Sequence, residues 1–224
     1  LLANSFRQFT SDMLWDLSRT FPYHTENKSA RPVDAFVSAI PMVYDFEVNE
    51  KWHQVTFFNP DQEKEKQLGI NISGDRVDGS LALDKQRTYY VYDFWNDNFV
   101  GKLDGSARLE QVLRPGEARM MSVREVLTVP QVLSANRHIM QGYLDIKETN
   151  WHPDRKSLNG ISRVVANDPY VISIAANGYK SLHCYSKEGS AKLNLLKESS
   201  DLVKLTIECL ENKEIEWAVV FDGG

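Results

Sequence analysis

Asp93 and Asp97 are the two carboxylates best placed to act as a pair, because they flank the aromatic residues Phe94 and Trp95. A glycosidase of the usual kind needs two carboxyl groups about 5–10 Å apart across a cleft. The sequence holds 31 acidic residues, so pairs of this kind arise easily and carry little weight. Asp93 also ends a predicted strand, where a carboxylate more often bonds backbone groups or a neighbouring arginine. We therefore predict no catalytic residue in this chain.

The histidines are scattered without the spacing of metal ligands: His24, His53, His138, His152 and His183. Arg137-His138 and Gln141-Gly142 invite comparison with a catalytic centre, because histidine is the usual proton shuttle. The neighbouring sequence supplies no nucleophile and orienting group, and it lacks a Gly-x-Ser-x-Gly motif. A Walker loop, an HExxH motif and a dinucleotide fingerprint are also missing from the sequence. We expect these polar residues to anchor a buried connection, and we predict neither a metal site nor a cofactor.

Carbohydrate binding is the main alternative to a purely structural role. Sugar-binding modules are often β-sandwiches in which exposed aromatic side chains stack on pyranose rings. Trp52, Trp95 and Trp151 are the candidates for such platforms. A Trp in a β-protein belongs to the core, or covers it, far more often than it serves as a platform. The three residues are therefore weak candidates.

Cys184 and Cys209 are the only cysteines, so a CxxC zinc motif is missing. Both fall on the apolar phase of predicted strands, which indicates two buried free thiols. A disulfide across adjacent strands is the alternative, although a chain of this length does not need one to fold.

Composition is that of an ordinary globular protein: 42% of the 224 residues are hydrophobic and 25% are charged. This length fits one large domain or two small ones. The net charge is −5 with no basic cluster, so a nucleic-acid partner is not expected. No apolar run approaches the ~20 residues of a membrane span. The start at Leu1 lacks an initiator Met and a signal pattern, and we interpret it as a cut end that gives no cellular address.

The stretch from Tyr89 to Gly101 is the organising strand of the predicted fold. Its aromatic and β-branched side chains alternate between two faces, with Tyr90 and Tyr92 on one and Tyr89 and Val91 on the other. Apolar residues on both faces indicate a strand that is covered on both sides. Residues 96–98 then break the strand in a turn.

Short strands separated by turns continue on either side and predict an antiparallel sandwich. Strands are expected over residues 43–48, 55–58, 68–72, 81–83, 107–113 and 118–123. Arg114-Pro115-Gly116-Glu117 reads as a type II turn joining the last two as a pair. Further on, Asn177-Gly178 is a strong hairpin signal between Tyr170–Ala175 and Tyr179–Tyr185. With two alternating strands over residues 203–209 and 215–221, these predict a second, immunoglobulin-like sandwich.

The N-terminal stretch from Ser5 to Phe21 predicts a helix. Ser5 and Gln8 have the spacing of a capping box, Pro22 ends the pattern, and an apolar stripe recurs at three and four residues. That stripe is expected to pack on the first sandwich near residues 35–42, or on a second copy of the chain. Arg31 and Asp34 are expected to form a salt bridge that fixes the following connection.

An aromatic strand ending in Asp-Phe-Trp, with a short turn and a Gly behind it, resembles the C-terminal sandwich of the α-galactosidases (melibiases). The resemblance covers residues 1–145 well and the remainder only in its strand pattern. The segments that carry it are Ala30–Asp34, Trp52–Asn59, Leu81–Leu83, Tyr89–Gly101, Leu113–Arg124 and Leu133–Gly142. The first and last of these are similar to larger microbial glycoside hydrolases related to that family.

The resemblance implies a non-catalytic accessory domain that packs on a catalytic (β/α) barrel supplied by another part of the parent chain. Residues 1–40 would then be the last barrel helix and a linker, 41–124 the first sandwich, and 125–224 the connection and the second sandwich. A polysaccharide-degrading parent would favour export or the periplasm. The expected partners are the barrel, a carbohydrate, or a second copy bound through the helix.

Overall fold

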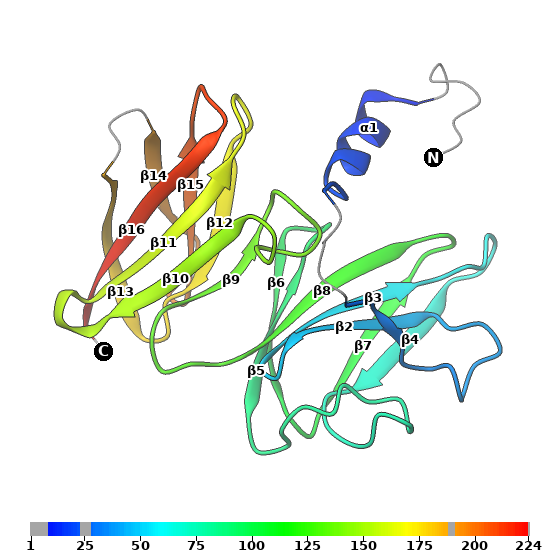
Figure 1. Ribbon diagram of the computed structural model, residues 1–224. Coiled ribbons are helices and arrows are strands. Elements are labelled where there is room, and N and C mark those ends of the chain that lie inside the picture. The colour runs from blue at the N-terminus through cyan, green and yellow to red at the C-terminus, as the bar shows by residue number, and fades with distance from the viewer. Residues whose placement is uncertain (1–8, 23–27, 188–190, 224) are drawn as a thin grey trace.

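The computed structural model describes residues 9–22, 28–187 and 191–223. It is mainly β, with antiparallel sheets forming two sandwich-like units and one short helix near the N-terminus (Figure 1). The predicted fold class is therefore confirmed. No helix in these three ranges is long and apolar enough to cross a membrane.

The first unit is built on six-stranded sheet A, whose strands follow the spatial order β1-β2-β3-β8-β5-β6. Two-stranded sheet B lies against one face of sheet A, and side chains from both sheets form one core that includes Val55, Phe57 and Leu109. Sheet A contains β1 (Arg31–Pro32), β2 (Val43–Asn49), β3 (Trp52–Phe58), β5 (Thr88–Asp93), β6 (Asn98–Asp104) and β8 (Ala118–Glu125). Sheet B contains β4 (Lys66–Asn71) and β7 (Arg108–Leu113).

The second unit packs two four-stranded sheets, in the orders β14-β15-β12-β9 for sheet C and β10-β11-β16-β13 for sheet D. Its core includes Ile172, Leu205 and Trp217. Sheet C contains β9 (Gln131–Ala135), β12 (Tyr170–Ala175), β14 (Lys192–Lys197) and β15 (Leu202–Glu208). Sheet D contains β10 (Ile146–His152), β11 (Ser157–Val164), β13 (Tyr179–Ser186) and β16 (Lys213–Gly223), and the 3-10 helix η2 (Pro153–Arg155) joins β10 to β11.

Sheet A is covered on both faces, as predicted for its strand β5. Tyr89 and Val91 point into the core between sheets A and B. Tyr90 and Tyr92 point the other way and pack with Leu133 and other residues of the second unit. The Tyr92 hydroxyl also accepts a hydrogen bond from Ser173 Oγ at 2.9 Å, while Tyr90 bonds Asn177. The two sandwiches are thus joined through a buried face.

The predicted connection over residues 126–145 is wrong in part, because Gln131–Ala135 form β9 of sheet C. The loop that follows β9 is anchored by buried polar groups. Gln141 donates from Nε2 to Gln54 Oε1 at 3.0 Å, and Arg124 donates to the Gln141 carbonyl at 2.9 Å. Arg137 forms an ion pair with Asp168 of the second unit. Gln141 and Gly142 both have positive φ, and a tight turn at this point needs such a backbone. These contacts give Arg137 and Gln141 the anchoring role expected from the sequence.

Two predicted strand pairings are wrong, and both fail in the same way. Residues 114–117 and 177–178 do form tight turns, with positive φ at Gly116, Asn177 and Gly178. However, β7 pairs with β4 of sheet B, whereas β8 pairs with β3 and β5 of sheet A. Likewise β12 belongs to sheet C and β13 to sheet D. Each turn carries the chain from one sheet to the other, because the apolar faces of both strands must meet across a core.

Three smaller expectations around the first core are corrected. Residues 81–83 form a loop instead of a strand, in which Leu81 and Leu83 are buried while Ala82 is exposed and has a φ of 58°. Arg31 pairs with Asp45 at 2.9 Å and not with Asp34. The Asp34 carboxylate accepts the backbone N–H groups of residues 42 and 43. Because β1 pairs with β2, the first sandwich begins ahead of residue 41.

The helix α1 (Ser11–Ser18) is shorter than predicted and begins at Thr10, whose hydroxyl accepts the Met13 N–H. The predicted capping box at Ser5 and Gln8 lies outside the described residues. The helix has no buried residue, so packing of its stripe on the loop 35–42 is wrong. Figure 1 shows α1 projecting away from both sandwiches. Its C-terminal end is held by the chain, where the Arg19 carbonyl accepts the Ile139 N–H at 3.0 Å.

Candidate functional site

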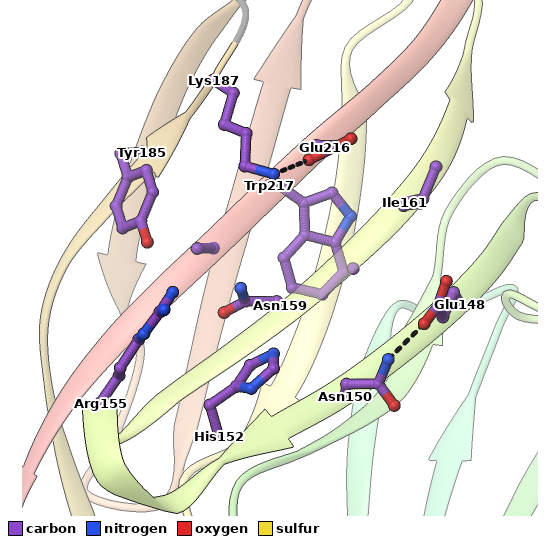
Figure 2. Close-up of a pocket in the computed structure, with 12 residues that line it drawn as sticks. Glu148, Asn150, His152, Arg155, Asn159, Ile161, Tyr185, Lys187, Glu216 and Trp217 are labelled. Atoms are coloured by element: carbon purple, nitrogen blue, oxygen red, sulfur yellow. Dashed lines mark hydrogen bonds and ion pairs between the residues drawn. The ribbon is translucent and has the colours of Figure 1, made fainter.

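A groove of about 380 Å³ crosses the outer face of sheet D (Figure 2). Every strand of the sheet contributes to it, together with η2. Its walls are mixed in charge and rich in hydrogen-bonding groups. The residues that line it are Glu148, Asn150, His152, Arg155, Asn159, Gly160, Ile161, Tyr185, Lys187, Glu216, Trp217 and Ala218.

The small side chain of Ala218 contributes to the hollow at the centre of the groove. Ala218 faces outward from β16 opposite Asn159 of β11, whereas Gly160 pairs with Trp217, whose side chain belongs to the core. The Trp217 ring lies directly beneath Gly160, so that a Cβ added there would come within 2.3 Å of Trp217 Cζ2. The indole is fixed by a hydrogen bond from Nε1 to Ser162 Oγ at 2.9 Å. The close approach of the indole to β11 beneath the groove therefore requires glycine at position 160.

The acidic residues of the groove already have donors. Glu216 accepts a hydrogen bond from Lys187 Nζ at 2.5 Å, and Glu148 accepts one from Asn150 (Figure 2). The bond to Glu216 is the main cause that raises the pKa of the Lys187 ammonium above its usual value. These two pairs hold charge of both signs along the upper and right-hand sides of the groove.

Other polar groups in the groove remain open to a ligand. Asn159 Oδ1 is buried and has no hydrogen-bond partner among the described residues. Arg155 and His152 are exposed, and no ion pair of either with a described residue is present. Tyr185 is 42% exposed and its ring stands at the edge of the groove (Figure 2). An acceptor, a guanidinium, an imidazole and an aromatic ring thus face one space.

Of the Trp candidates, Trp52 and Trp151 have their rings engaged in packing. The Arg124 guanidinium lies 3.4 Å from the Trp52 ring centroid, and Tyr143 approaches the same ring edge-on at 6.1 Å. Trp151 makes edge-on contacts with Tyr179 and Phe221 and packs against the core of the second unit. Both Trp side chains are half-buried.

Trp95 is 39% exposed and lies in the turn after β5. Its ring contacts Phe94 edge-on, with centroids 5.0 Å apart. It lines a second hollow, of about 280 Å³, together with Trp15 of α1. The three Trp candidates are therefore in separate parts of the fold, and Trp95 keeps the most open ring.

The carboxylates considered for catalysis serve the backbone and the junction. Asp93 accepts hydrogen bonds from the backbone and side chain of Asn96. Asp97 accepts the Tyr92 hydroxyl at 2.7 Å and the Lys204 ammonium at 2.7 Å. Both are thus engaged in local structure, in line with the interpretation from the sequence.

A histidine–carboxylate pair that the sequence did not reveal joins β2 to β3. His53 Nδ1 lies 2.8 Å from Asp45 Oδ1, and Arg31 binds the other oxygen of that carboxylate. Both His53 and Asp45 are only 1% exposed, although Asp45 borders a hollow that Arg31 also lines. The pair joins two neighbouring strands of sheet A.

The junction between the sandwiches holds a second ionisable cluster. Asp145 is buried, which raises the pKa of its carboxyl group to about 6, while the Tyr170 hydrogen bond and the charges of Arg137 and Arg124 act in the opposite sense. Burial lowers the pKa of the Arg124 guanidinium to about 9. The cluster lies between packed elements, and Arg124 also lines a hollow of about 280 Å³ together with Trp52 and Tyr143.

Both cysteines are free thiols, as predicted, but the predicted burial holds for Cys209 and not fully for Cys184. Cys209 is buried and Cys184 is half-buried; burial raises the pKa of the Cys184 thiol. No group of three or more His, Cys, Asp or Glu side chains in the described ranges could hold a metal ion.

The groove residues Tyr185, Asn159 and Arg155 were missed at the level of sequence. The signal available was the alternation of β11, β13 and β16, which predicts which side chains face outward. Alternation does not predict which strands lie side by side. The order in the sheet is β10-β11-β16-β13, which differs from the order in the sequence, so the outward-facing side chains that share the groove could not be grouped in advance.

Comparison with known proteins gives no further guide: no protein-family profile matches this chain, and neither does any curated protein sequence.

Proposed function

We propose that this chain is a non-catalytic accessory module of an α-galactosidase-like glycoside hydrolase, and that it packs on the catalytic (β/α) barrel of its parent. Support comes from the motifs at Trp52–Asn59, Tyr89–Gly101 and Leu133–Gly142, and from the double-sandwich architecture in which they lie. The motifs fall on the two-sided sheet A and on the buried connection, so their residues serve the scaffold.

The observation that carries the proposal is the apolar surface of α1. Met13, Leu14 and Trp15 are 54%, 45% and 53% exposed. The C-terminal end of the helix is nevertheless held in place by Arg19, which forms an ion pair with Asp168 at 3.4 Å. A helix that is fixed at one end and apolar on its open side is suited to cover a neighbouring domain. In the resembling family that neighbour is the barrel.

The test uses the full-length natural polypeptide that contains this sequence. We expect Met13→Ser with Leu14→Ser to lower the melting temperature of the full-length protein by several degrees, while leaving the isolated chain unchanged. Leu210→Ser is the matched control, because Leu210 is 80% exposed and belongs to the second unit. A full-length protein without a barrel, or equal effects of the α1 and control variants, would overturn the proposal.

A direct test of the non-catalytic role is hydrolysis of an aryl α-galactoside by the isolated chain. We expect no release of the phenol. Turnover that disappears on substitution of a single carboxylate would show that the chain is itself an enzyme.

Carbohydrate binding is a second candidate function, and the groove on sheet D favours it. Tyr185 offers an exposed ring beside hydrogen-bonding groups, and Asn159 Oδ1 offers a buried acceptor without a partner. Aromatic stacking combined with convergent polar groups is what a sugar requires. Binding of oligosaccharides measured by titration calorimetry should be lost in Tyr185→Ala and kept in Trp151→Phe. Equal binding by both variants would place the sugar elsewhere.

A further inference from the structure

We infer that the groove on sheet D binds a glycan that carries a carboxylate, namely a uronic acid residue, and that Arg155 recognises that carboxylate. This inference rests on the second candidate function, carbohydrate binding in the groove. It adds the chemical class of the sugar and the residue that selects it.

The charges of the groove carry the first step. Four of the lining residues are charged: Glu148, Glu216, Arg155 and Lys187. Glu216 is satisfied by Lys187 at 2.5 Å, and Glu148 accepts from Asn150. The Asn150 amide is neutral, so Glu148 keeps its negative charge and the four charges of the groove sum to zero. Arg155 is the cation that no ion pair joins to a residue in the described ranges, so a ligand anion would find its counter-charge at Arg155.

The position of Arg155 carries the second step. It ends η2, the short 3-10 helix between β10 and β11, and Lys156 follows it in the left-handed conformation with a φ of 45°. This turn directs the Arg155 side chain back along the groove, toward Asn159 and below Tyr185 (Figure 2). Its charge acts on Lys187, whose pKa it lowers slightly against the larger effect of Glu216. The guanidinium thus lies inside the groove and within electrostatic range of its far side.

The uncharged groups of the groove, Asn159 and Tyr185, indicate what kind of molecule carries the anion. Asn159 Oδ1 is a buried acceptor without a protein partner and therefore calls for a hydroxyl or amide donor. Tyr185 presents its ring beside it, and the His183 ring centroid lies 6.3 Å from the Tyr185 ring centroid. A ligand with a hydroxyl donor, an apolar ring face and a carboxylate on one small body is a uronic acid. A bare phosphate or acetate would use Arg155 alone and leave Asn159 unsatisfied.

The geometry of an arginine strengthens the choice of carboxylate. A guanidinium presents a planar fork of donors that matches a carboxylate with two parallel hydrogen bonds. Hydrogen bonds to charged groups are roughly twice as strong as neutral ones. Loss of the carboxylate, or of the guanidinium, should therefore weaken binding by about tenfold or more.

The test is calorimetric titration of the intact chain with two uronates of different stereochemistry, oligogalacturonide and oligomannuronate, each against its carboxyl-reduced neutral counterpart. At least one acidic oligomer should bind about tenfold more tightly than its neutral form. Arg155→Gln should abolish that difference. Arg163→Gln is the matched control, because Arg163 lies on β11 of the same sheet, pairs with Glu214 and does not line the groove.

Each outcome decides one part of the reasoning. Equal affinity for acidic and neutral oligomers would overturn the role of Arg155 and leave carbohydrate binding standing. A preference for the acidic form that Arg163→Gln also removes would assign it to general surface charge, and would overturn the inference as well. Absence of binding by all four oligomers would reject both the inference and the second candidate function, whereas the accessory role depends on α1 and is tested separately. Melting curves of both variants check that the fold is retained, which is expected because both arginines are exposed.

Discussion

Gly160→Ala should destabilise the protein through a clash that the structure locates to single atoms. The new methyl carbon would lie 2.3 Å from Trp217 Cζ2, 2.7 Å from Cε2 and 2.9 Å from the Glu148 carbonyl oxygen. Ordinary contacts of a methyl carbon begin near 3.4 Å, so the indole must move by about 1 Å. It is held by the hydrogen bond to Ser162 and by the surrounding core, and therefore does not move freely.

The expected loss follows from three terms. Overpacking of a core costs about 1–3 kcal/mol. A weakened indole hydrogen bond adds roughly 0.5–1.5 kcal/mol. Replacement of glycine by alanine returns about 0.4–1 kcal/mol by restricting the unfolded chain. The net loss is roughly 0.5–4 kcal/mol, which for a protein of this length lowers the melting temperature by roughly 1–16 °C.

Denaturant unfolding followed by Trp fluorescence measures this loss. Gly69→Ala is the matched control: Gly69 also lies in a strand, but its added methyl would meet only the end of the flexible Arg108 side chain, at 2.8 Å. That variant should stay within about 0.5 kcal/mol of the parent.

The double variant of Gly160→Ala with Trp217→Phe tests the cause. Phe lacks the ring atoms that the methyl group meets, so the two changes should couple favourably by about 1 kcal/mol or more. A Gly160→Ala protein as stable as the parent, or purely additive effects in the double variant, would refute the proposed contact between Gly160 and the indole.

Three further outcomes are expected. Burial raises the pKa of the Asp145 carboxyl group from its ordinary value of 3.8 to about 6, so the folded protein binds this proton more tightly than the unfolded chain does. The protonated carboxyl group therefore stabilises the fold below pH 4, and this stabilisation is lost as the pH rises through 6. The free energy of unfolding is measured for Asp145→Asn and for the parent from pH 4 to 7. The difference, variant minus parent, should rise by up to about 3 kcal/mol over this range, and a difference that does not change with pH would contradict the raised pKa. Trp95→Ala should cost about 1–2 kcal/mol in urea unfolding, well below the ~3–5 kcal/mol of an emptied core site, because the ring is partly exposed and its main aromatic neighbour is Phe94. Asp168→Ala should free α1 at its held end, seen as faster proteolysis near Arg19; unchanged cleavage would show that the ion pair does not hold the helix.

Sequence patterns predicted the strand β5 and its surroundings well, because the signal was local. Tyr89 to Asp93 carries large side chains on both faces, and burial on both faces follows from alternation alone. The same holds for the turns at Gly116 and Asn177-Gly178, where the residue types match the positive φ that the backbone adopts.

Strand partners could not be predicted in the same way. The turns at Gly116 and Asn177-Gly178 are short enough for hairpins, yet each joins two different sheets. Which strand a neighbour pairs with depends on where its apolar face finds cover, and that is a property of the whole core. The pair Arg31–Asp45 was missed for the same reason, since Asp34 is nearer in the sequence but is occupied by backbone N–H groups.

The candidate groove depended even more on long-range arrangement. Each of its open groups, Arg155, Asn159 and Tyr185, is unremarkable in its own strand or loop. They share one space because β16 lies between β11 and β13, although it is the last strand of the chain. Sequence reasoning favoured tryptophans, and a polar hollow beside a single tyrosine gives no comparable local signal.

The double cover of sheet A has a consequence for how this protein can be divided. Tyr90, Tyr92 and Phe46 would become an exposed aromatic face if the chain were cut after the first sandwich. Exposed apolar surface of that kind favours self-association. In the second sandwich, Leu133 and Leu202 would become exposed, because Tyr90 and Tyr92 cover them in the intact protein. We therefore expect that neither sandwich stays soluble and folded on its own. Gene fusions or insertions that preserve function are expected to carry both sandwiches together.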